Sequence, residues 1–277
     1  MFGDFPLSQK IIVITGGASG IGLSLAKLAL DSNARVSIAD LKPTLDSTRL
    51  ADHDGIRFIK CDVSRWDDLT SIIHFSKAEF GDVPDIFVAN AGVSETEENS
   101  FWDDNDDGRY SALDINLYHP IKLTRLAIRA LLGRRKKGVV VITASIAGLH
   151  GHFTTPLYSA GKHGLIGLIK SLAAAEDEAG VKVVGICPGP VRTPLMATVE
   201  NRLSGTDERP TLLEPEEIAG RMKELIEQGN YHGGMALGVY RPGHAEVVAD
   251  GSISALEDMC PPDVMAVRKI ISEERDI

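Results

Sequence analysis

The sequence from Lys10 to Gly22 reads KIIVITGGASGIG. Its first part, Lys10 to Thr15, is a short run rich in β-branched residues, and a glycine-rich turn, Gly16 to Gly22, follows it. A helical pattern over Leu23 to Leu30 comes next, and then a second strand-like run over Arg35 to Asp40. Strand, glycine turn, helix and strand in this order predict a turn that binds a dinucleotide.

The spacing of the glycines suits a pyrophosphate. Glycines at 16, 20 and 22 allow a tight turn, close approach of the backbone to the phosphates and close packing of helix on sheet. The helix that begins after them offers free N–H groups and the positive end of its dipole. Asp40 ends the second predicted strand, where a carboxylate can accept hydrogen bonds from both hydroxyls of a ribose. Glycines and aspartates are common in ordinary turns, but here the two signals coincide.

Strand-like and helix-like stretches alternate along the rest of the chain. Further strands are predicted at Ile56–Cys61, Asp85–Ala89, Val139–Ala144, Val181–Cys187 and Met235–Tyr240. Further helices are predicted at Arg65–Phe80 with Ser64 as N-cap, at Gly108–Leu132 with a kink at Pro120, at Tyr158–Ala175, and onward from Pro215. This alternation predicts an α/β fold: a single Rossmann-type, doubly wound parallel sheet of about seven strands with helices on both faces.

We expect one dehydrogenase-sized domain over residues 1–250, including a substrate loop at 194–214. Residues 251–277 form a C-terminal tail, for which three alternatives stay open: it closes over the substrate site, it contacts a neighbouring subunit, or it is partly disordered.

A second informative stretch runs from Thr143 to His163, TASIAGLHGHFTTPLYSAGKH. Tyr158 and Lys162 are four residues apart in a helical pattern, so both side chains lie on one face of the helix. Ser145 follows a buried strand and can reach the same place. A free tyrosine titrates near pH ~10, and a neighbouring cation should lower the pKa of Tyr158 towards the working pH of a general acid or base. Alone, such a Tyr/Lys pair is more often a half-exposed packing pair.

Composition excludes several classes of function. The net charge of −10 argues against a nucleic acid or an anionic membrane as partner. The basic cluster Arg134–Lys137 is typical of a solvated helix C-terminus. The three cysteines, Cys61, Cys187 and Cys260, have no CxxC spacing, which predicts neither a disulfide framework nor a metal site. No signal peptide or membrane-spanning run is visible, so we expect a cytoplasmic enzyme.

Together these motifs resemble the short-chain dehydrogenase/reductase family over roughly residues 9–240. Thr15–Gly22 matches its TGxxxGxG loop, and Asn90-Ala91-Gly92 matches its NNAG turn, with Ala89 in place of the first asparagine. The resemblance implies the catalytic residues Asn116, Ser145, Tyr158 and Lys162. It implies cofactor contacts from Gly16, Ser19, Gly20, Ile21, Gly22, Asp40, Asp62, Val63, Asn90, Ala91, Gly92, Tyr158, Lys162, Pro188, Gly189, Val191 and Thr193.

The same resemblance implies a mechanism. Tyr158 would pass a proton to or from the substrate oxygen, which Ser145 holds. Lys162 would bind the nicotinamide ribose and lower the pKa of Tyr158, while Asn116 would hold a water that links Lys162 to solvent. We therefore expect an NAD(H)-dependent oxidoreductase acting on a lipophilic secondary alcohol or ketone, assembled as a homodimer or homotetramer. Two alternatives remain: a dinucleotide-binding sensor or scaffold without redox chemistry, and an isomerase or dehydratase on the same fold.

The substrate is expected to contact three segments: Val93–Trp102, Ile146–Pro156 and Pro194–Thr211. His150, His152 and Phe153 stand out in the second of these, although a histidine in such a loop is more often solvated or packed than catalytic. The pocket should be mainly apolar.

Overall fold

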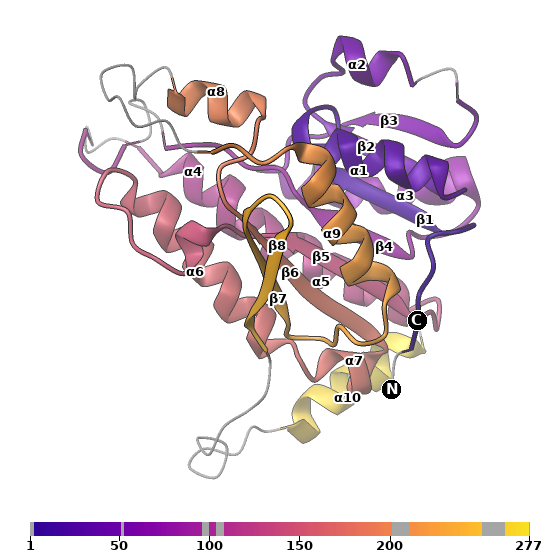
Figure 1. Cartoon of the computed structure of the whole chain (residues 1–277). Helices are drawn as coiled ribbons and strands as arrows, with labels where there is room; N and C mark the ends of the chain where they lie inside the picture. Colours follow the sequence, from indigo (N-terminus) through magenta and orange to yellow (C-terminus); the bar gives the residue numbers. More distant parts are fainter. Residues whose placement is uncertain are drawn as a thin grey trace.

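The computed structural model describes residues 3–50, 53–95, 100–103, 108–200, 211–250 and 264–276. Within these ranges the chain forms one eight-stranded sheet between two layers of helices (Figure 1). The strands are β1 Ile11–Thr15, β2 Arg35–Asp40, β3 Ile56–Lys60, β4 Ile86–Ala89, β5 Gly138–Thr143, β6 Val181–Pro188, β7 Ala236–Arg241 and β8 His244–Ala249. Their order across the sheet is β3-β2-β1-β4-β5-β6-β7-β8.

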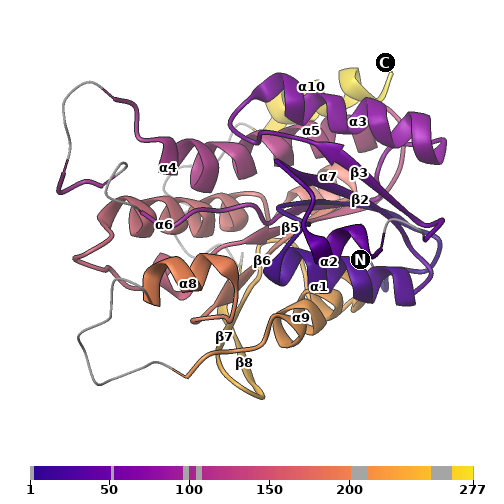
Figure 2. The same cartoon turned by 90° about the horizontal axis from the view of Figure 1, so that it is seen from above.

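The helices are α1 Gly20–Asp31, α2 Leu45–Thr48, α3 Trp66–Phe80, α4 Ser111–Leu113, α5 His119–Leu132, α6 Pro156–Ser171, α7 Ala175–Ala179, α8 Pro194–Glu200, α9 Pro215–Glu227 and α10 Val264–Arg275, with a π-helical turn η2 at Asp114–Tyr118 and a 3₁₀ turn η3 at Ile146–Gly148. Helices α1 and α9 cover one face of the sheet, and α3, α5 and α6 cover the other (Figure 2). The central strands β1, β4, β5 and β6 are buried throughout or nearly so, as expected for parallel strands covered on both sides.

The strand order reverses between β1 and β4. From β1 the chain moves outward to β2 and β3, then returns to β4 and continues outward in the opposite direction. In an open α/β sheet, ligands bind in the crevice beyond the carboxyl ends of the strands at such a reversal. The fold therefore places a binding site after Thr15 and Ala89, where the glycine turn and the Asn90-Ala91-Gly92 segment begin.

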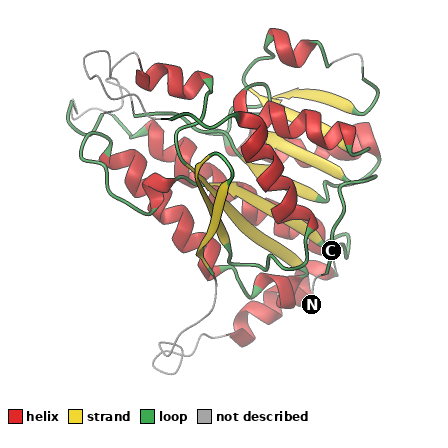
Figure 3. Cartoon of the chain, in the orientation of Figure 1, coloured by secondary structure: helices red, strands yellow, loops and turns green. Residues whose placement is uncertain are grey.

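The predicted fold class is confirmed, and the strand count is one higher than the expected seven. β8 pairs antiparallel with β7, and together they form a hairpin at the edge of the sheet (Figure 3). Pro242 and Gly243 form its turn, and Gly243 has a φ of 74°, a value that glycine adopts without strain. β8 escaped prediction because an edge strand is half exposed and its sequence, HAEVVA, lacks the apolar run of a buried strand.

The long helix predicted at Gly108–Leu132 is present from Ser111 to Leu132, but a π-helical turn interrupts its α-helical bonding. The structure has the three-residue helix α4, then the π-helical turn η2, and α5 only from His119. Pro120, the residue predicted to kink the helix, is the second residue of α5 and follows the π-helical turn directly. Proline has no N–H to donate to the carbonyl four residues earlier, here that of Asn116, which explains why regular α-helical bonding stops at this point. Asn116 lies in the resulting turn.

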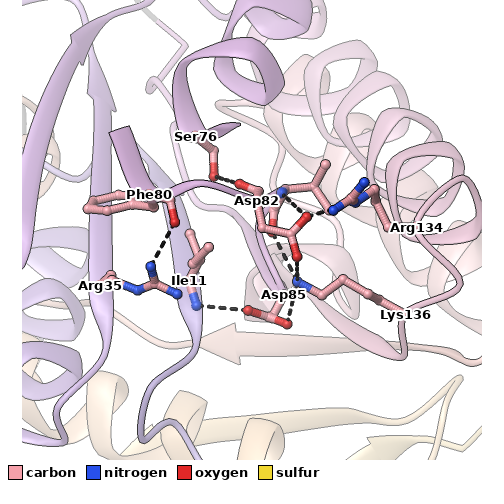
Figure 4. A network of polar contacts seen from close by, with 9 residues as sticks. Ile11, Arg35, Ser76, Phe80, Asp82, Asp85, Arg134 and Lys136 are labelled. Atoms are coloured by element: carbon pink, nitrogen blue, oxygen red, sulfur yellow. Dashed lines mark hydrogen bonds and ion pairs between the residues drawn. The ribbon is translucent and has the colours of Figure 1, made fainter. Parts of the chain in front are cut away.

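Two residues of the basic cluster Arg134–Lys137, Arg134 and Lys136, have a structural role at the amino ends of the central strands (Figure 4). The Lys136 ammonium lies 3.0 Å from Asp82 and 2.9 Å from Asp85, and Arg134 lies 2.9 Å from Asp82. Asp85 also accepts a hydrogen bond from the backbone N–H of Ile11. These contacts join the amino ends of β1 and β4.

The described part of the C-terminal tail, residues 264–276, packs on its own chain. α10 lies beside α7 and the C-terminal half of α5 (Figure 1). Arg268 forms an ion pair with Glu178 of α7, and Glu274 pairs with Arg125 and Arg129 of α5. Residues 251–263, which include Cys260, lie outside the described residues. No helix in the described ranges is long and apolar enough to cross a membrane.

Candidate active site

A cavity of about 590 Å³ opens at the carboxyl ends of the central strands. Most of the residues predicted for the site line it: Gly16, Ser19, Gly20, Ile21, Asp40, Asp62, Val63, Asn90, Ala91, Gly92, Ser145, Tyr158, Lys162, Pro188, Gly189, Val191 and Thr193. Gly22 and Asn116 are not among the lining residues; they lie behind the wall and support it. The fold thus brings residues from seven separate parts of the chain to one cavity.

The glycine turn is shaped by close backbone contacts. Gly16 has a φ of 63°, and a Cβ placed on it would lie 2.8 Å from the Cα of Ala91. Gly20 has a φ of 51°, and its Cβ would lie 2.9 Å from the side chain of Thr193. At Gly22 a Cβ would come within 2.4 Å of the carbonyl oxygen of Gly16. Any side chain at these positions would displace the turn from its neighbours.

The start of α1 fits a phosphate group. The side chain of Ser19, the N-cap, makes no capping hydrogen bond, and the first turn of α1 holds no acidic residue. Its N–H groups and the positive end of the dipole are therefore left for an anion. The glycines have no side chains, so a ligand can approach the backbone closely. Together with the free N–H groups of the helix, this fits the pyrophosphate of a dinucleotide.

Asp40 lies at the end of β2, close to the glycine turn. Its carboxylate accepts hydrogen bonds from the backbone N–H of Ala18 at 3.0 Å and of Leu41 at 2.8 Å. These two bonds fix the carboxylate at the wall of the cavity and leave it further lone pairs, since a carboxylate offers about four acceptor positions. The position suits recognition of vicinal hydroxyls.

Asn90 holds the two halves of the crevice together. Its side-chain amide donates to the carbonyl oxygens of Thr15 and Gly16, and its carbonyl oxygen accepts from the hydroxyl of Thr143. The hydroxyl of Thr15 in turn accepts from the backbone N–H of Asn90 and donates to Val88. Asn90 therefore joins β1, β4 and β5 at their carboxyl ends, and Ala89, buried in β4, leaves this arrangement intact.

Ser145, Tyr158 and Lys162 meet in the cavity as predicted. Ser145 follows β5, and its hydroxyl lies close enough to that of Tyr158 to lower the pKa of the tyrosine. Lys162, one turn further along α6, is buried and donates from Nζ to the carbonyl oxygen of Thr143 at 2.8 Å. Its Nζ lies 5.5 Å from the centre of the Tyr158 ring, over the face of the ring.

The expected lowering of the Tyr158 pKa is wrong. Burial raises the pKa of Tyr158, and the hydrogen bond from Ser145 offsets only part of this rise. Burial also lowers the pKa of Lys162 to about 8. Helical spacing indicates the attraction between a cation and a phenolate, but it does not indicate that both groups lose their water on burial. At neutral pH, Tyr158 is therefore a phenol able to donate its proton.

Asn116 acts on the cavity wall through its side chain. The amide oxygen accepts from the backbone N–H of Val93 at 3.0 Å, and the amide nitrogen donates to the carbonyl oxygen of Val93 at 2.9 Å. This pair of bonds fixes the segment that follows Gly92. The side chain is buried.

Two of the three segments expected to face the substrate, Val93–Trp102 and Ile146–Pro156, contact each other. The indole N–H of Trp102 donates to the carbonyl oxygen of Phe153 at 2.8 Å, and the centres of the two rings are 4.7 Å apart. Both aromatic side chains are more than half exposed. From the third segment, Leu195 and Met196 line the cavity; residues 201–210, the middle of the predicted substrate loop, lie outside the described residues.

Sequence reasoning missed two buried residues beside the site. Glu95 accepts hydrogen bonds from the first turn of α6, and His119 is fully buried at the start of α5. The Nδ1 atom of His119 lies 3.2 Å from the carbonyl oxygen of Ile115, whereas its Nε2 has no partner among the described residues. Only the low frequency of buried charged or polar side chains would have marked them, and burial is not visible in the sequence.

His119 makes the stability of the protein depend on pH. Burial lowers its pKa from 6.5 to about 3, against a smaller opposing effect of the Ile115 carbonyl and with a further lowering by Lys162. Between these two values the unfolded chain binds a proton that the native protein does not, so the free energy of unfolding should fall as the pH drops from 6.5 towards 3. The slope from this group approaches about 1.4 kcal/mol per pH unit.

Urea unfolding of the wild type and of His119→Leu, measured at pH 7, 6, 5 and 4, tests this. The wild type should lose stability relative to the variant as the pH falls. His74→Asn, which changes an exposed histidine on α3, serves as the control and should follow the wild type. Parallel curves for wild type and His119→Leu would contradict the assignment.

Comparison with known proteins agrees with this geometry. A family model described as short chain dehydrogenase matches residues 10–204. The chain is 35% identical over 201 residues to the short-chain dehydrogenase/reductase prx4 of Penicillium roqueforti, an alignment that covers 70% of this chain and 58% of that protein. It is 36% identical over 197 residues to (+)-borneol dehydrogenase 1 of Salvia officinalis, covering 69% of this chain and 73% of that protein.

Two further comparisons extend the match. A 2,5-dichloro-2,5-cyclohexadiene-1,4-diol dehydrogenase of Sphingobium indicum is 29% identical over 227 residues, which are 80% of this chain and 87% of that protein. The crystal structure of a short-chain type dehydrogenase/reductase from Mycobacterium marinum superposes with a TM-score of 0.76 at 23% identity, covering 86% of this chain and 96% of that one, and supports the fold.

The matched region contains the glycine turn, Asn90 with its bonds to the neighbouring strands, and the cluster of Ser145, Tyr158 and Lys162. The chain belongs to the short chain dehydrogenase family, whose members are oxidoreductases that use a nicotinamide dinucleotide.

Proposed function

We propose that this protein is an NAD-dependent oxidoreductase that interconverts a lipophilic secondary alcohol and its ketone. The observation that carries the proposal is the arrangement of one cavity. Ser145, Tyr158 and Lys162 lie at one end of it, and the glycine turn with Asp40 lies at the other.

In this proposal each residue has a distinct role. Tyr158 donates its proton to the substrate oxygen during reduction and accepts it during oxidation, while Ser145 holds the same oxygen by a hydrogen bond. Lys162 is held by its hydrogen bond to the Thr143 carbonyl oxygen, and its ammonium would hold the nicotinamide ribose. Asn116 has its carbonyl freed from α-helical bonding by Pro120, which suits it to hold a water between Lys162 and solvent. The nicotinamide ring, when bound, supplies or accepts the hydride.

The lining of the cavity supports an uncharged substrate. Among the described lining residues near Tyr158 are Val93, Ile146, Leu195 and Met196, and the one cation there, Lys162, is bonded to the backbone. Among the described lining residues of this part of the cavity, a carboxylate or phosphate on the substrate would meet no ammonium or guanidinium group other than that of Lys162. The names of the sage and Sphingobium relatives both denote cyclic secondary alcohols as substrates. We therefore propose a neutral, preferably cyclic, secondary alcohol.

A substrate screen tests this proposal. Purified protein with NAD⁺ should produce NADH from members of a panel of neutral cyclic and acyclic secondary alcohols, and should leave hydroxy acids and sugar phosphates unreacted. Turnover of the charged compounds alone would refute the substrate class. No turnover of any alcohol with either NAD⁺ or NADP⁺ would favour a binding protein without redox chemistry.

The proposal includes a homo-oligomer paired through α5 and α6. Gly161 and Gly164 of α6 already approach Leu113 and Leu117 of the same chain, so packing within one chain accounts for these two glycines. Gly167, by contrast, would carry a Cβ with nothing within 4 Å, and Tyr118 and Ile121 beside this surface are exposed. Light scattering at micromolar concentration should give at least twice the 29.8 kDa of one chain, and a monomer mass would contradict the proposal.

A cytoplasmic location belongs to the same proposal. Cys61 and Cys187 are buried free thiols, which suits a reducing compartment.

A further inference from the structure

The first turn of α6, which carries Tyr158, has an unusual cap. The N-cap residue, Thr155, makes no capping hydrogen bond with its side chain. Pro156, the first residue of the helix, has no N–H, and the N–H of Ser159 bonds to the carbonyl oxygen of Thr155. The other two N–H groups of this turn, those of Leu157 and Tyr158, have no acceptor within the helix.

Both of these groups donate to one carboxylate from a distant part of the chain. Oε2 of Glu95 accepts from Leu157 N at 2.9 Å and from Tyr158 N at 3.1 Å. Oε1 of the same side chain accepts from the backbone N–H of Phe101 at 2.9 Å. Glu95 is 2% exposed although it borders the cavity, and these N–H groups and the helix dipole stabilise its charge.

We infer that Glu95 is a positioning residue for Tyr158: its carboxylate holds the first turn of α6 in the conformation that places the tyrosine beside Ser145. We call the bonds from Leu157 and Tyr158 to Glu95 the helix clamp. Its kinetic consequences rest on the proposed function, whereas the clamp itself does not. Helix ends fray when their N–H groups lose their partners, and Tyr158 is only the third residue of α6. Lys162, one turn further along and bonded to Thr143, has its own anchor.

The two anchors predict that the proton-transfer group and the cofactor-binding group respond differently to loss of Glu95. In Glu95→Ala the first turn loses two hydrogen bonds and a negative charge at its positive end, so Tyr158 should move while Lys162 stays. A misplacement of a reacting group by about 1 Å lowers rates by roughly a hundredfold. We expect kcat to fall by about ten- to a hundredfold and the Kd for NADH to stay within about twofold of the wild type.

Glu95→Gln separates the helix clamp from the contact with Phe101. The amide of glutamine has one acceptor oxygen, which can accept from both N–H groups of α6. Its NH₂ group then faces the N–H of Phe101, and because both groups are donors this hydrogen bond is lost. Glu95→Gln should therefore keep kcat within about fivefold of the wild type. Glu227→Gln is the matched control, because Glu227 also accepts a backbone N–H, that of Leu7, far from the cavity. It should leave both kcat and the Kd for NADH unchanged.

A second readout needs neither substrate nor cofactor. Hydrogen exchange of the Leu157 and Tyr158 amides should be faster by about ten- to a hundredfold in Glu95→Ala than in the wild type, with no change in Glu227→Gln. Amides in the second half of α6 should keep their protection. This arm separates failure of the clamp from failure of the proposed function, since it reports on the clamp even if no alcohol is oxidised.

Steady-state kinetics below the melting temperature of each variant, NADH titration and amide exchange together decide the matter. Loss of kcat with intact NADH binding and faster exchange at the start of α6 supports the clamp. Wild-type kcat or unchanged amide exchange in Glu95→Ala overturns it, as does a parallel loss of NADH affinity. If Glu95→Ala does not fold, Glu95→Asp takes its place: its carboxylate is one methylene shorter, so it should reproduce the loss of kcat and of amide protection.

Discussion

Replacing Tyr158 with phenylalanine should lower kcat by at least about a hundredfold, the range that a general acid or base contributes. The ring, which Lys162 faces at 5.5 Å, remains, so the Kd for NADH should change little. The lost hydroxyl lies beside Ser145 and keeps its proton at neutral pH because burial raises its pKa. Kinetics with an alcohol identified in the substrate screen, together with NADH titration, measure both quantities.

Two variants accompany this test. Tyr231→Phe removes the hydroxyl of a tyrosine that packs against the core on the α9 side and should leave kcat unchanged. Lys162→Ala should lose both turnover and NADH affinity, since the ammonium is proposed to hold the ribose. Turnover of Tyr158→Phe close to that of the wild type would rule out Tyr158 as the proton-transfer residue.

The second large effect concerns the choice between NAD and NADP. The carboxylate of Asp40 is fixed at the cavity wall by the N–H groups of Ala18 and Leu41. It can accept both adenine-ribose hydroxyls of NAD, but it would face the 2′-phosphate of NADP as a like charge. One lost charge-assisted hydrogen bond and one repulsive contact amount to about 3 kcal/mol, or roughly a hundredfold in kcat/KM in favour of NAD.

The double variant Asp40→Ser, Leu41→Arg should narrow or reverse this preference. Leu41 is 58% exposed, so an arginine there can reach a phosphate without disturbing the core. Asp46→Ser on α2 is the control: it removes a nearby carboxylate that pairs only with Arg49 among the contacts described, and it should leave the preference unchanged. Equal kcat/KM for NAD⁺ and NADP⁺ in the wild type would contradict the role of Asp40. In that case the nearest cation in sequence that could bind the 2′-phosphate is Lys42, two positions after Asp40.

Much of the fold and site was predictable because the decisive signals are local. The strand that ends at Thr15, the glycines that follow it and the helix after them form one continuous stretch. The positive φ values of Gly16 and Gly20 are what that spacing predicts. The helical spacing of Tyr158 and Lys162 likewise placed both on one face of α6.

What the sequence did not reveal depends on contacts between distant segments. Glu95 and Tyr158 are 63 residues apart, so no local pattern indicates that one caps the helix of the other. The π-helical turn at Asn116 lies in a stretch whose apolar spacing is helical throughout, and only the tertiary structure shows where α-helical bonding ends. The pKa of Tyr158 was given the wrong direction because burial, which dominates it, is a property of the folded chain.

The central claim is that this cavity transfers a hydride between a neutral secondary alcohol and NAD. The most direct test uses an alcohol that turns over in the screen, with deuterium on its carbinol carbon, and mass spectrometry of the reduced cofactor. We expect one deuterium per NADH formed and none when the label is on the hydroxyl. Product formed without deuterium in the cofactor would contradict the claim and would indicate isomerisation or elimination at Tyr158 instead.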